Sequence, residues 1–310
     1  MRDLNLRVLR IFEVSASCES FSRAAEILDI SQPAVSMQIR QFEEEVGVRL
    51  FERHARNVVL TDAGRDLLAH VRGILARVRI AEDALGSLRT DFRGQLHLGV
   101  ISTAHYFAPW LLQAFRAEYP DVRVKLTVDS RDAILSALKE HRLDVAISGF
   151  PPAQADVEAE TFAQHPHCIV ASPQHRLAGR RNLSWAELSD EPFIFREPGS
   201  ATRSFLEHLL HANAVRVNVL TEMHGNETVK QAIMAQMGIS FMSAHAIQLE
   251  LETGRLLVLD VVDMPKMLDW CLIHRRDVVL SGVNDRFRRF VLEHGARIAA
   301  CRASASGLLR

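Results

Sequence analysis

The sequence contains little of what several common classes of protein require. Its 310 residues include only four cysteines and no Cys-x-x-Cys pair, so we expect neither a disulfide scaffold nor a structural zinc site. Aromatic residues make up 6% of the chain, which disfavours stacking-based binding of single-stranded nucleic acid. No apolar run approaches the ~18 residues of a membrane helix. The 37 Lys and Arg residues are balanced by 38 Asp and Glu residues, which excludes a uniformly basic coating protein but allows a small DNA-binding domain.

The beginning of the sequence lacks the continuous apolar stretch of a secretory signal. Arg2 and Asp3 lead instead into an amphipathic segment, so we expect a cytoplasmic protein. In a reducing cytosol the cysteines remain thiols, and a redox-sensing pair of Cys168 with Cys271 is the alternative. The cysteines are Cys18, Cys168, Cys271 and Cys301.

The segment from residue 4 to about residue 90 is predicted to be almost entirely helical. Three helices are expected before Gly47, and the third begins with Ser31-Gln32-Pro33, which is typical of a first helical turn. Phe51–Leu60 predicts a short hairpin with basic residues near its tip. Thr61 then caps a long helix whose apolar seam continues for about eight turns. Such a helix usually pairs with another chain, so we expect a homodimer; packing within its own domain is the alternative.

From Gln95 onward the sequence alternates between strands and helices. Residues 95–148 follow a β-α-β-α-β pattern, which predicts a parallel sheet. A second series begins with a strand at Cys168, and a further strand near Trp270–His274 precedes a final helix. Two α/β lobes with two crossings between them imply a cleft, and such clefts hold small ligands.

Two histidines, His165 and His167, flank Pro166 at one of the predicted crossings. Imidazoles at this spacing could bind a metal ion, but no third ligand is evident. We therefore expect solvated imidazoles at a hinge and no metal site.

The helices around residues 20–45 and the basic hairpin that follows predict a winged helix-turn-helix. The second helix of this motif lies in the major groove and presents its N-terminal residues to base edges. Gln32 can hydrogen-bond a base edge, Pro33 offers an apolar contact to a thymine methyl, and hairpin arginines can meet phosphates. A plain helical bundle with solvated arginines is the alternative. The predicted DNA-binding residues are Ser31, Gln32, Pro33, Ser36, Arg40, Arg53 and Arg56.

Several linked motifs resemble those of the LysR-type transcriptional regulators. The resemblance spans nearly the whole chain and implies an α + α/β protein, with a winged helix-turn-helix, a long linker helix and a two-lobed effector domain like periplasmic binding proteins. Family members are typically dimers of dimers on promoter DNA, paired through the linker helix. Met37-Gln38 departs from the more polar or basic pair of many members, which affects the operator sequence rather than the mode of binding. The motifs are Ser20–Leu28, Ser31–Ser36, Gly47–Arg53 and Leu60–Gly64.

This layout implies the domain boundaries and the partners. Residues 1–60 would form the DNA-binding domain, 61–90 the linker and dimerisation helix, and 91–300 the effector-binding domain. Its lobe I would comprise about 91–164 and 268–300, and its lobe II about 165–267. The expected partners are double-stranded promoter DNA, a small-molecule effector and further copies of the chain in a homotetramer, with RNA polymerase as another candidate.

Further stretches are similar to the branch of this family that activates RuBisCO operons in autotrophic bacteria. That branch implies phosphorylated sugars, related glycolytic anions or nicotinamide nucleotides as signals. A regulator of another metabolic operon with a different effector is the alternative. The stretches are Ile101–Pro109, His165–His167, Ala171–His175, Arg196–Ser200, Asn226–Ala232 and Met237–Ser240.

Hydroxyl and backbone N–H groups gather where predicted strands end and helices begin in both lobes. Such positions bind anions with the help of the helix dipole, at the carboxyl ends of parallel strands. Arg131 and Arg203 are the best candidates for pairing with an anion, and Lys230 is a weaker one. Ordinary helix capping is the alternative for each residue alone. The predicted effector-binding residues are Ser102, Thr103, Ser130, Arg131, Ser148, Gly149, Gly199, Ser200, Thr202, Arg203 and Asn226.

Two other functions are less consistent with the sequence. An enzyme would need a nucleophile or a cofactor loop, but we find no Gly-x-Ser-x-Gly, Gly-x-Gly-x-x-Gly or Gly-x-x-x-x-Gly-Lys motif. We therefore expect no catalytic residues and no cofactor. A periplasmic solute-binding protein would need an export signal and no N-terminal helix set. The sequence thus predicts a ligand-responsive transcription factor, in which the effector shifts the population of tetramer geometries and so changes DNA bending.

Overall fold

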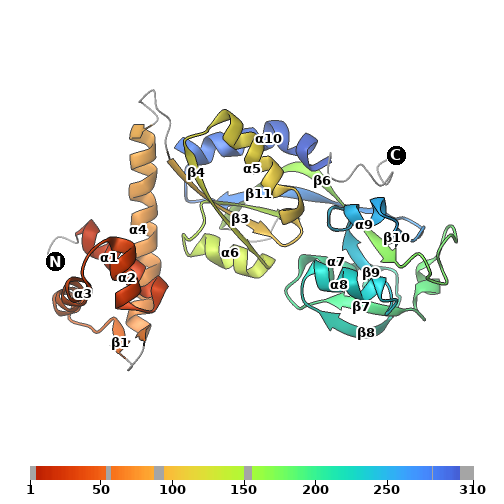
Figure 1. Ribbon diagram of the computed structural model, residues 1–310, viewed down its shortest axis with the longest axis horizontal. Coiled ribbons are helices and arrows are strands. Elements are labelled where there is room, and N and C mark those ends of the chain that lie inside the picture. The colour runs from red at the N-terminus through yellow and green to blue at the C-terminus, as the bar shows by residue number, and fades with distance from the viewer. Residues whose placement is uncertain (1–4, 54–56, 87–93, 150–155, 281, 301–310) are drawn as a thin grey trace. The chain divides into compact units, whose positions relative to one another are not determined.

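The computed structural model describes residues 5–53, 57–86, 94–149, 156–280 and 282–300 (Figure 1). The chain divides into two compact units, one formed mainly by residues before 89 and one by the remainder. Each unit has its own hydrophobic core. In the described ranges, no helix is both long enough and apolar enough to cross a membrane.

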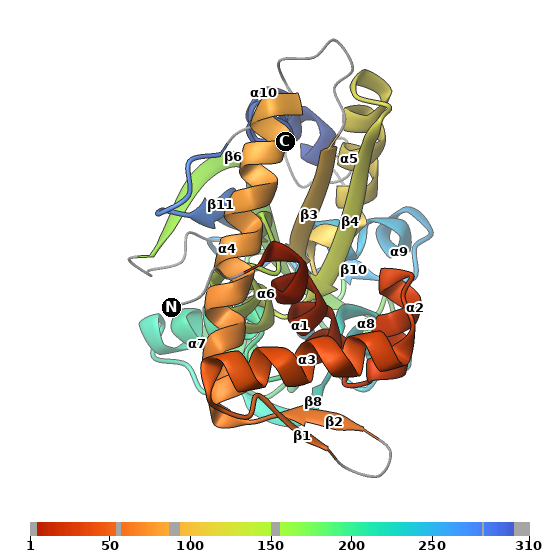
Figure 2. The same ribbon diagram turned by 90° about the vertical axis from the view of Figure 1, so that its left-hand side faces the viewer.

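The first unit contains three short helices, a hairpin and a long helix. Figure 2 shows α3 lying across the unit, with the hairpin beneath it. Ser20 caps α2 and Ser31 caps α3 through hydrogen bonds that their hydroxyls accept from backbone N–H groups. The elements are α1 (Leu6–Cys18), α2 (Phe21–Leu28), α3 (Gln32–Val46), β1 (Phe51–Arg53), β2 (Val58–Leu60) and α4 (Asp62–Gly86).

The hairpin and α4 are joined tightly at Thr61 and Gly64. The Thr61 hydroxyl donates to the carbonyl of Arg49 and accepts from the N–H of Gly64, as expected for the cap of the long helix. A Cβ atom at Gly64 would lie 2.2 Å from the carbonyl oxygen of Leu50, so only glycine allows this approach. The Thr-Asp-Ala-Gly motif therefore fixes the direction in which the long helix leaves the hairpin.

Only part of the apolar face of the long helix α4 packs against the core of the first unit. Leu68 and Val71 are buried in the core of the first unit. This part of the helix packs within its own domain, which was the alternative to pairing with another chain. Ile74 and Leu85 remain exposed on the same helix. The first unit thus leaves apolar side chains of α4 uncovered toward its C-terminal part.

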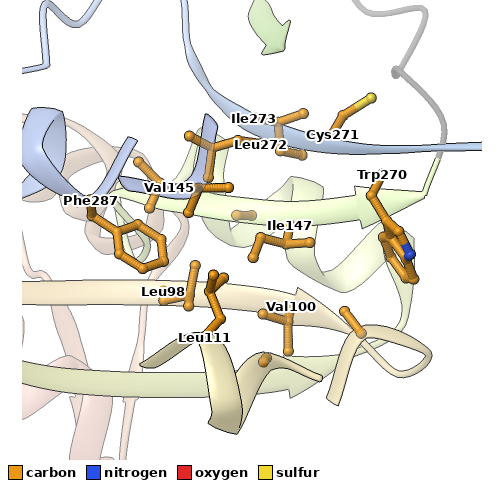
Figure 3. Packing of buried hydrophobic residues seen from close by; sticks show 14 of the residues in the cluster. Leu98, Val100, Leu111, Val145, Ile147, Trp270, Cys271, Leu272, Ile273 and Phe287 are labelled. Atoms are coloured by element: carbon orange, nitrogen blue, oxygen red, sulfur yellow. The ribbon is translucent and has the colours of Figure 1, made fainter. Parts of the chain in front are cut away.

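Lobe I of the second unit is a sheet covered by helices on both faces. Strand β3 pairs in parallel with β4 and β5, which confirms the predicted β-α-β-α-β pattern. Helices α5 and α10 cover one face and α6 the other (Figure 1). Leu98, Val100 and Ile147 pack in its core with Phe287 (Figure 3). The elements are β3 (Gly94–Ile101), α5 (Ala108–Glu118), β4 (Val122–Asp129), α6 (Arg131–Lys139), β5 (Val145–Gly149), β11 (Lys266–Arg275) and α10 (Gly282–Ala300).

Lobe II contains a second α/β arrangement with its own core. Strands β7 and β8 are parallel, and α7 and α8 pack against the lobe's strands. Besides short one-turn helices, the elements are β6 (Val157–Ala171), β7 (Pro192–Arg196), α7 (Ala201–Ala212), β8 (Asn218–Met223), α8 (Asn226–Met234), β9 (Ser240–Ser243), α9 (Gln248–Glu252) and β10 (Leu257–Val258).

Two antiparallel strands, β6 and β11, connect the lobes. Their register runs from Lys266 opposite His167 to Arg275 opposite Val157. The prediction that a strand begins at Cys168 was wrong, because β6 begins at Val157. The first part of β6 contains polar residues and a proline, so it does not show the apolar pattern of a strand. Its extended conformation is stabilised by pairing with β11.

The histidines at this crossing are buried, so the prediction of solvated imidazoles was wrong. His165 stacks on Trp270, His167 stacks on Phe241, and His245 lies close to His165. Burial lowers the pKa of His167 to about 3 and that of His245 to about 4, and it also lowers the pKa of His165. The three imidazoles therefore act as neutral packing groups, which we call the histidine cluster.

The cysteines also take structural positions. Cys168 and Cys271 are buried free thiols in different core clusters, so the redox pair considered from the sequence is not formed. Burial raises the pKa of Cys168 to about 12, which suppresses its thiolate. Cys18 is also free, and Cys301 lies outside the described residues.

The histidine cluster predicts that the second unit loses stability in mild acid. Below about pH 6.5 the unfolded chain binds protons that the folded chain refuses, so the free energy of unfolding falls as the pH falls toward 4. Each buried histidine contributes a slope of about 1.4 kcal/mol per pH unit. His167→Asn, which keeps a donor for the carbonyl of His165, should reduce the slope by about that amount in denaturant titrations. The exposed His211→Gln is the control, and equal slopes for His167→Asn and wild type would contradict the prediction.

Candidate DNA-recognition helix and interlobe polar site

The N-terminal part of α3 presents the residues predicted to contact bases. Ser31 is the N-cap, Gln32 and Pro33 lie exposed in the first turn, and Arg40 is exposed two turns later. Ser36 is half-buried on the same helix. The opposite face of α3 is buried in the core of the unit. The structure therefore places these five residues on or beside one accessible helix face.

The acidic residues of α3 lie at its C-terminal end. Glu43 accepts hydrogen bonds from the backbone N–H groups of Leu50 at 2.8 Å and Phe51 at 3.0 Å. Glu45 accepts from Gln41. Glu43 is thereby directed to the turn before the hairpin and away from the first turn of α3.

The predicted wing is formed by β1 and β2. Phe51 pairs with Leu60 and Arg53 with Val58, which confirms the predicted hairpin. Only the backbone of Arg53 is described, and Arg56 lies outside the described residues. Their predicted roles in phosphate binding stay predictions.

In lobe I the predicted effector-binding residues follow the carboxyl ends of three parallel strands. Ser102 and Thr103 follow β3, Ser130 and Arg131 follow β4, and Ser148 and Gly149 end β5. Because β3 is parallel to both β4 and β5, these ends share one edge of the sheet. Ser130 caps α6 through its hydroxyl, and Arg131 is half-buried with a pKa lowered by burial.

A hydrogen-bond network joins this edge to lobe II. Arg196, at the end of β7, donates to the Ser102 hydroxyl at 3.3 Å and to the side-chain oxygen of Asn226. Asn226 in turn donates to the carbonyl of Ser102 at 3.5 Å. Ser102 and Asn226 were predicted from the sequence, and the structure brings them together through Arg196. We call these three residues the interlobe network.

Glu197 balances the charge of the buried guanidinium. It accepts from Arg196 at 2.6 and 2.7 Å and from the N–H of Gly225 at 3.2 Å. Burial alone would raise the pKa of Glu197, but these hydrogen bonds lower it to about 2. Arg196 is therefore a fixed donor whose charge is already compensated.

Thr103, next to Ser102 in the chain, carries a buried hydroxyl group. Its side chain is 3% exposed, and its Oγ1 has no hydrogen-bond partner among the described residues. A buried hydroxyl without a partner costs free energy, so a ligand atom or a water is needed to satisfy it. The Thr103 hydroxyl is therefore a buried donor and acceptor that a water or a polar ligand atom could bind.

The remaining predicted residues lie at the end of β5 and around the start of α7. Ser148 is buried, and Gly149 abuts the histidine cluster, since a Cβ there would lie 2.7 Å from Nδ1 of His165. Gly199 has a φ of +82°, and Asp132 of lobe I lies close to it. Ser200 and Thr202 are buried at the start of α7.

Two of the cations that the sequence favoured for anion pairing, Arg203 and Lys230, form ion pairs within lobe II. Arg203 pairs with Glu207 and Glu222, both at 2.8 Å. Lys230 pairs with Glu227 at 2.8 Å and Glu250 at 3.0 Å. These ion pairs leave Arg203 and Lys230 as structural groups in this state of the protein.

Two residues of the interlobe contact, Arg196 and Tyr106, were not predicted from the sequence. Arg196 was part of the stretch Arg196–Ser200 that resembles the RuBisCO-operon branch, but it was not predicted as a site residue; an Arg-Glu pair at the carboxyl end of a strand was the signal that could have marked it. Tyr106 of lobe I donates to Glu227 of lobe II at 2.6 Å, and burial and this hydrogen bond raise the pKa of Tyr106. Nothing in the local sequence indicated that pair.

Across the described ranges, no group of three His, Cys, Asp or Glu side chains is placed to hold a metal ion.

Comparisons with known proteins agree with both units. The model of the bacterial regulatory helix-turn-helix protein, lysR family, matches residues 6–65, and the model of the LysR substrate binding domain matches residues 89–296. The RuBisCO operon transcriptional regulator of Allochromatium vinosum is 42% identical over 295 residues, which cover 95% of this chain and 98% of that protein. The HTH-type transcriptional regulator CbbR of Rhodospirillum rubrum is 45% identical over 287 residues, covering 93% and 95% of the two chains.

A solved structure is similar to the second unit. The regulatory domain of Synechocystis PCC6803 CcmR, in complex with 2-PG, has a TM-score of 0.63 and 35% identity, and the match covers 65% of this chain and 97% of that one. The helix-turn-helix, the two-lobed α/β domain and these relatives lead to one conclusion. The chain belongs to the LysR family of DNA-binding transcriptional regulators, and its relatives include regulators of RuBisCO operons.

Proposed function

We propose that this regulator controls carbon-fixation genes in response to a small phosphorylated anion bound beside the interlobe network. The observation that carries the proposal is the convergence of Arg196, Ser102 and Asn226 from the two lobes next to the unpartnered hydroxyl of Thr103. Donors from two lobes can sense a ligand because they change partners when the lobes move. The 2-PG complex of CcmR supports the chemical class of the effector.

The relatives support the choice of target genes. The RuBisCO operon transcriptional regulator of Allochromatium vinosum matches 95% of this chain at 42% identity, and a second RuBisCO operon transcriptional regulator, of Acidithiobacillus ferrooxidans, matches 96% at 36% identity. The proposal makes the chain a cytoplasmic regulator without catalytic activity or a bound cofactor. Its response is a shift between two arrangements of the lobes, of which the effector binds one more tightly.

On the DNA side, the proposal places α3 in the major groove. Gln32 and Pro33 contact base edges, Ser31 and Ser36 contact bases or phosphates, and Arg40 binds a phosphate. The apolar residues that α4 leaves exposed, Ile74 and Leu85, support pairing of two chains through this helix, and two such pairs make the homotetramer.

The effector site can be tested with Thr103→Val. The substitution keeps the shape of the side chain and removes a buried hydroxyl that has no partner, so the variant without ligand should be as stable as wild type or more stable. The rise in melting temperature on adding 2-PG should fall by at least half. Differential scanning fluorimetry with 2-PG, and with inorganic phosphate alone, measures both effects.

Thr221→Val on β8 provides the matched control, with an unchanged response to 2-PG. An intact 2-PG response in Thr103→Val would remove Thr103 from the site. The absence of any response in the wild-type protein would reject 2-PG as the effector.

DNA binding can be tested with Arg40→Ala. Loss of one phosphate contact should weaken binding to all duplexes alike and lower the slope of log K against log salt by about 0.9. Fluorescence anisotropy at several salt concentrations measures the slope. Arg255→Ala, which removes an exposed charge from the other unit, should leave the slope unchanged. An unaltered slope in Arg40→Ala would show that Arg40 makes no phosphate contact.

A further inference from the structure

One large apolar side chain is exposed on the face of α3 that the proposed function assigns to DNA. Met37 is 61% exposed, whereas the apolar residues Val35, Ile39 and Phe42 of the same helix are fully buried. Met37 therefore adds nothing to the core. Its position four residues after Pro33 and three before Arg40 puts all three residues on one helix face.

The surroundings of Met37 fit a polyanion and do not fit an apolar protein surface. From residue 32 to residue 40 the only charged side chain is Arg40, and the first turn of α3 contains no acidic residue. The first carboxylate, Glu43, is held by the backbone of the turn before β1. On the helix surface, the neighbours of Met37 are Pro33 and Ala34 on one side and the polar Arg40 and Gln41 on the other, so the exposed apolar area around Met37 is small.

The major groove of DNA presents one apolar group, the C5-methyl of thymine. A methionine side chain is flexible and polarisable, so it can reach and cover such a methyl group. We propose that Met37 is a specificity-determining residue that contacts a thymine methyl in each half-site. The inference rests on the proposed placement of α3 in the major groove.

Pro33 and Met37 are related as neighbours on one helix face. One turn of an α-helix advances about 5.4 Å along the axis, or somewhat more than one base-pair step of about 3.4 Å. The two residues therefore contact different base pairs, and Met37 specifies a position that Pro33 does not reach. This separates the effect of Met37 from that of the first turn.

Replacement of thymine by deoxyuridine tests this contact directly, because it removes the methyl group and leaves base pairing intact. A duplex recovered by binding selection with the wild-type protein is prepared with each thymine replaced in turn. For the wild-type protein, we expect one replacement per half-site, apart from any that Pro33 senses, to weaken binding about fivefold. Met37→Ala should bind the unmodified duplex about fivefold more weakly and lose no further affinity at that position.

Two variants control for trivial effects. Met37→Leu keeps an apolar side chain and should retain most of the sensitivity to deoxyuridine. Val46→Ala removes an exposed apolar residue from the other end of α3 and should leave the whole profile unchanged. Because Met37 is exposed, its variants should melt at the same temperature as the wild-type protein.

The outcomes separate the two proposals. If the wild-type protein prefers its selected duplex but Met37→Ala retains the same deoxyuridine profile, or if no replacement weakens wild-type binding, the role of Met37 is overturned and the placement of α3 stands. If the wild-type protein binds its selected duplex no better than random DNA, the placement of α3 in the groove fails with it.

Discussion

The pairing of β6 with β11 is the constraint on which the effector domain depends. Each strand contributes to lobe I, and β6 continues into lobe II, where it pairs with β9 and β10. The histidine cluster and Trp270 fill the space at this crossing with flat, closely stacked rings. Because hydrogen bonds hold both strands along their length, the lobes can change their angle only by bending or twisting here, while their separate cores stay intact.

The interlobe network is a second connection between the lobes, besides the paired strands β6 and β11. Arg196 carries a charge in a buried position, and such a charge persists only where a carboxylate and polar acceptors surround it. Glu197, the next residue in the chain, supplies the negative charge that balances the Arg196 guanidinium. The neutral acceptors on Ser102 and Asn226 are therefore not needed to balance that charge. In the proposed function, oxygen atoms of the effector would replace these neutral acceptors, while Glu197 keeps the charge of Arg196 balanced.

The elements that neighbouring residues determine could be predicted from the sequence. Ser31-Gln32-Pro33 marked the start of α3, Thr61 marked that of α4, and alternation of strands and helices gave the parallel order of β3, β4 and β5. The long strand β6 was missed in part because its pairing partner is about a hundred residues away. The burial of His165 and His167 and the role of Arg196 also depend on distant contacts, which no local pattern records.

The close fit of Gly64 against the carbonyl of Leu50 has a mechanical meaning for the DNA-binding unit. Thr61 bridges the Arg49 carbonyl and the Gly64 N–H, and the close approach of Gly64 to Leu50 leaves no room for a side chain. The residues just before the hairpin and the first turn of α4 are therefore tied together at two points. A change in the angle between α4 and the hairpin would have to break these contacts, so a movement of the helix would carry the hairpin with it.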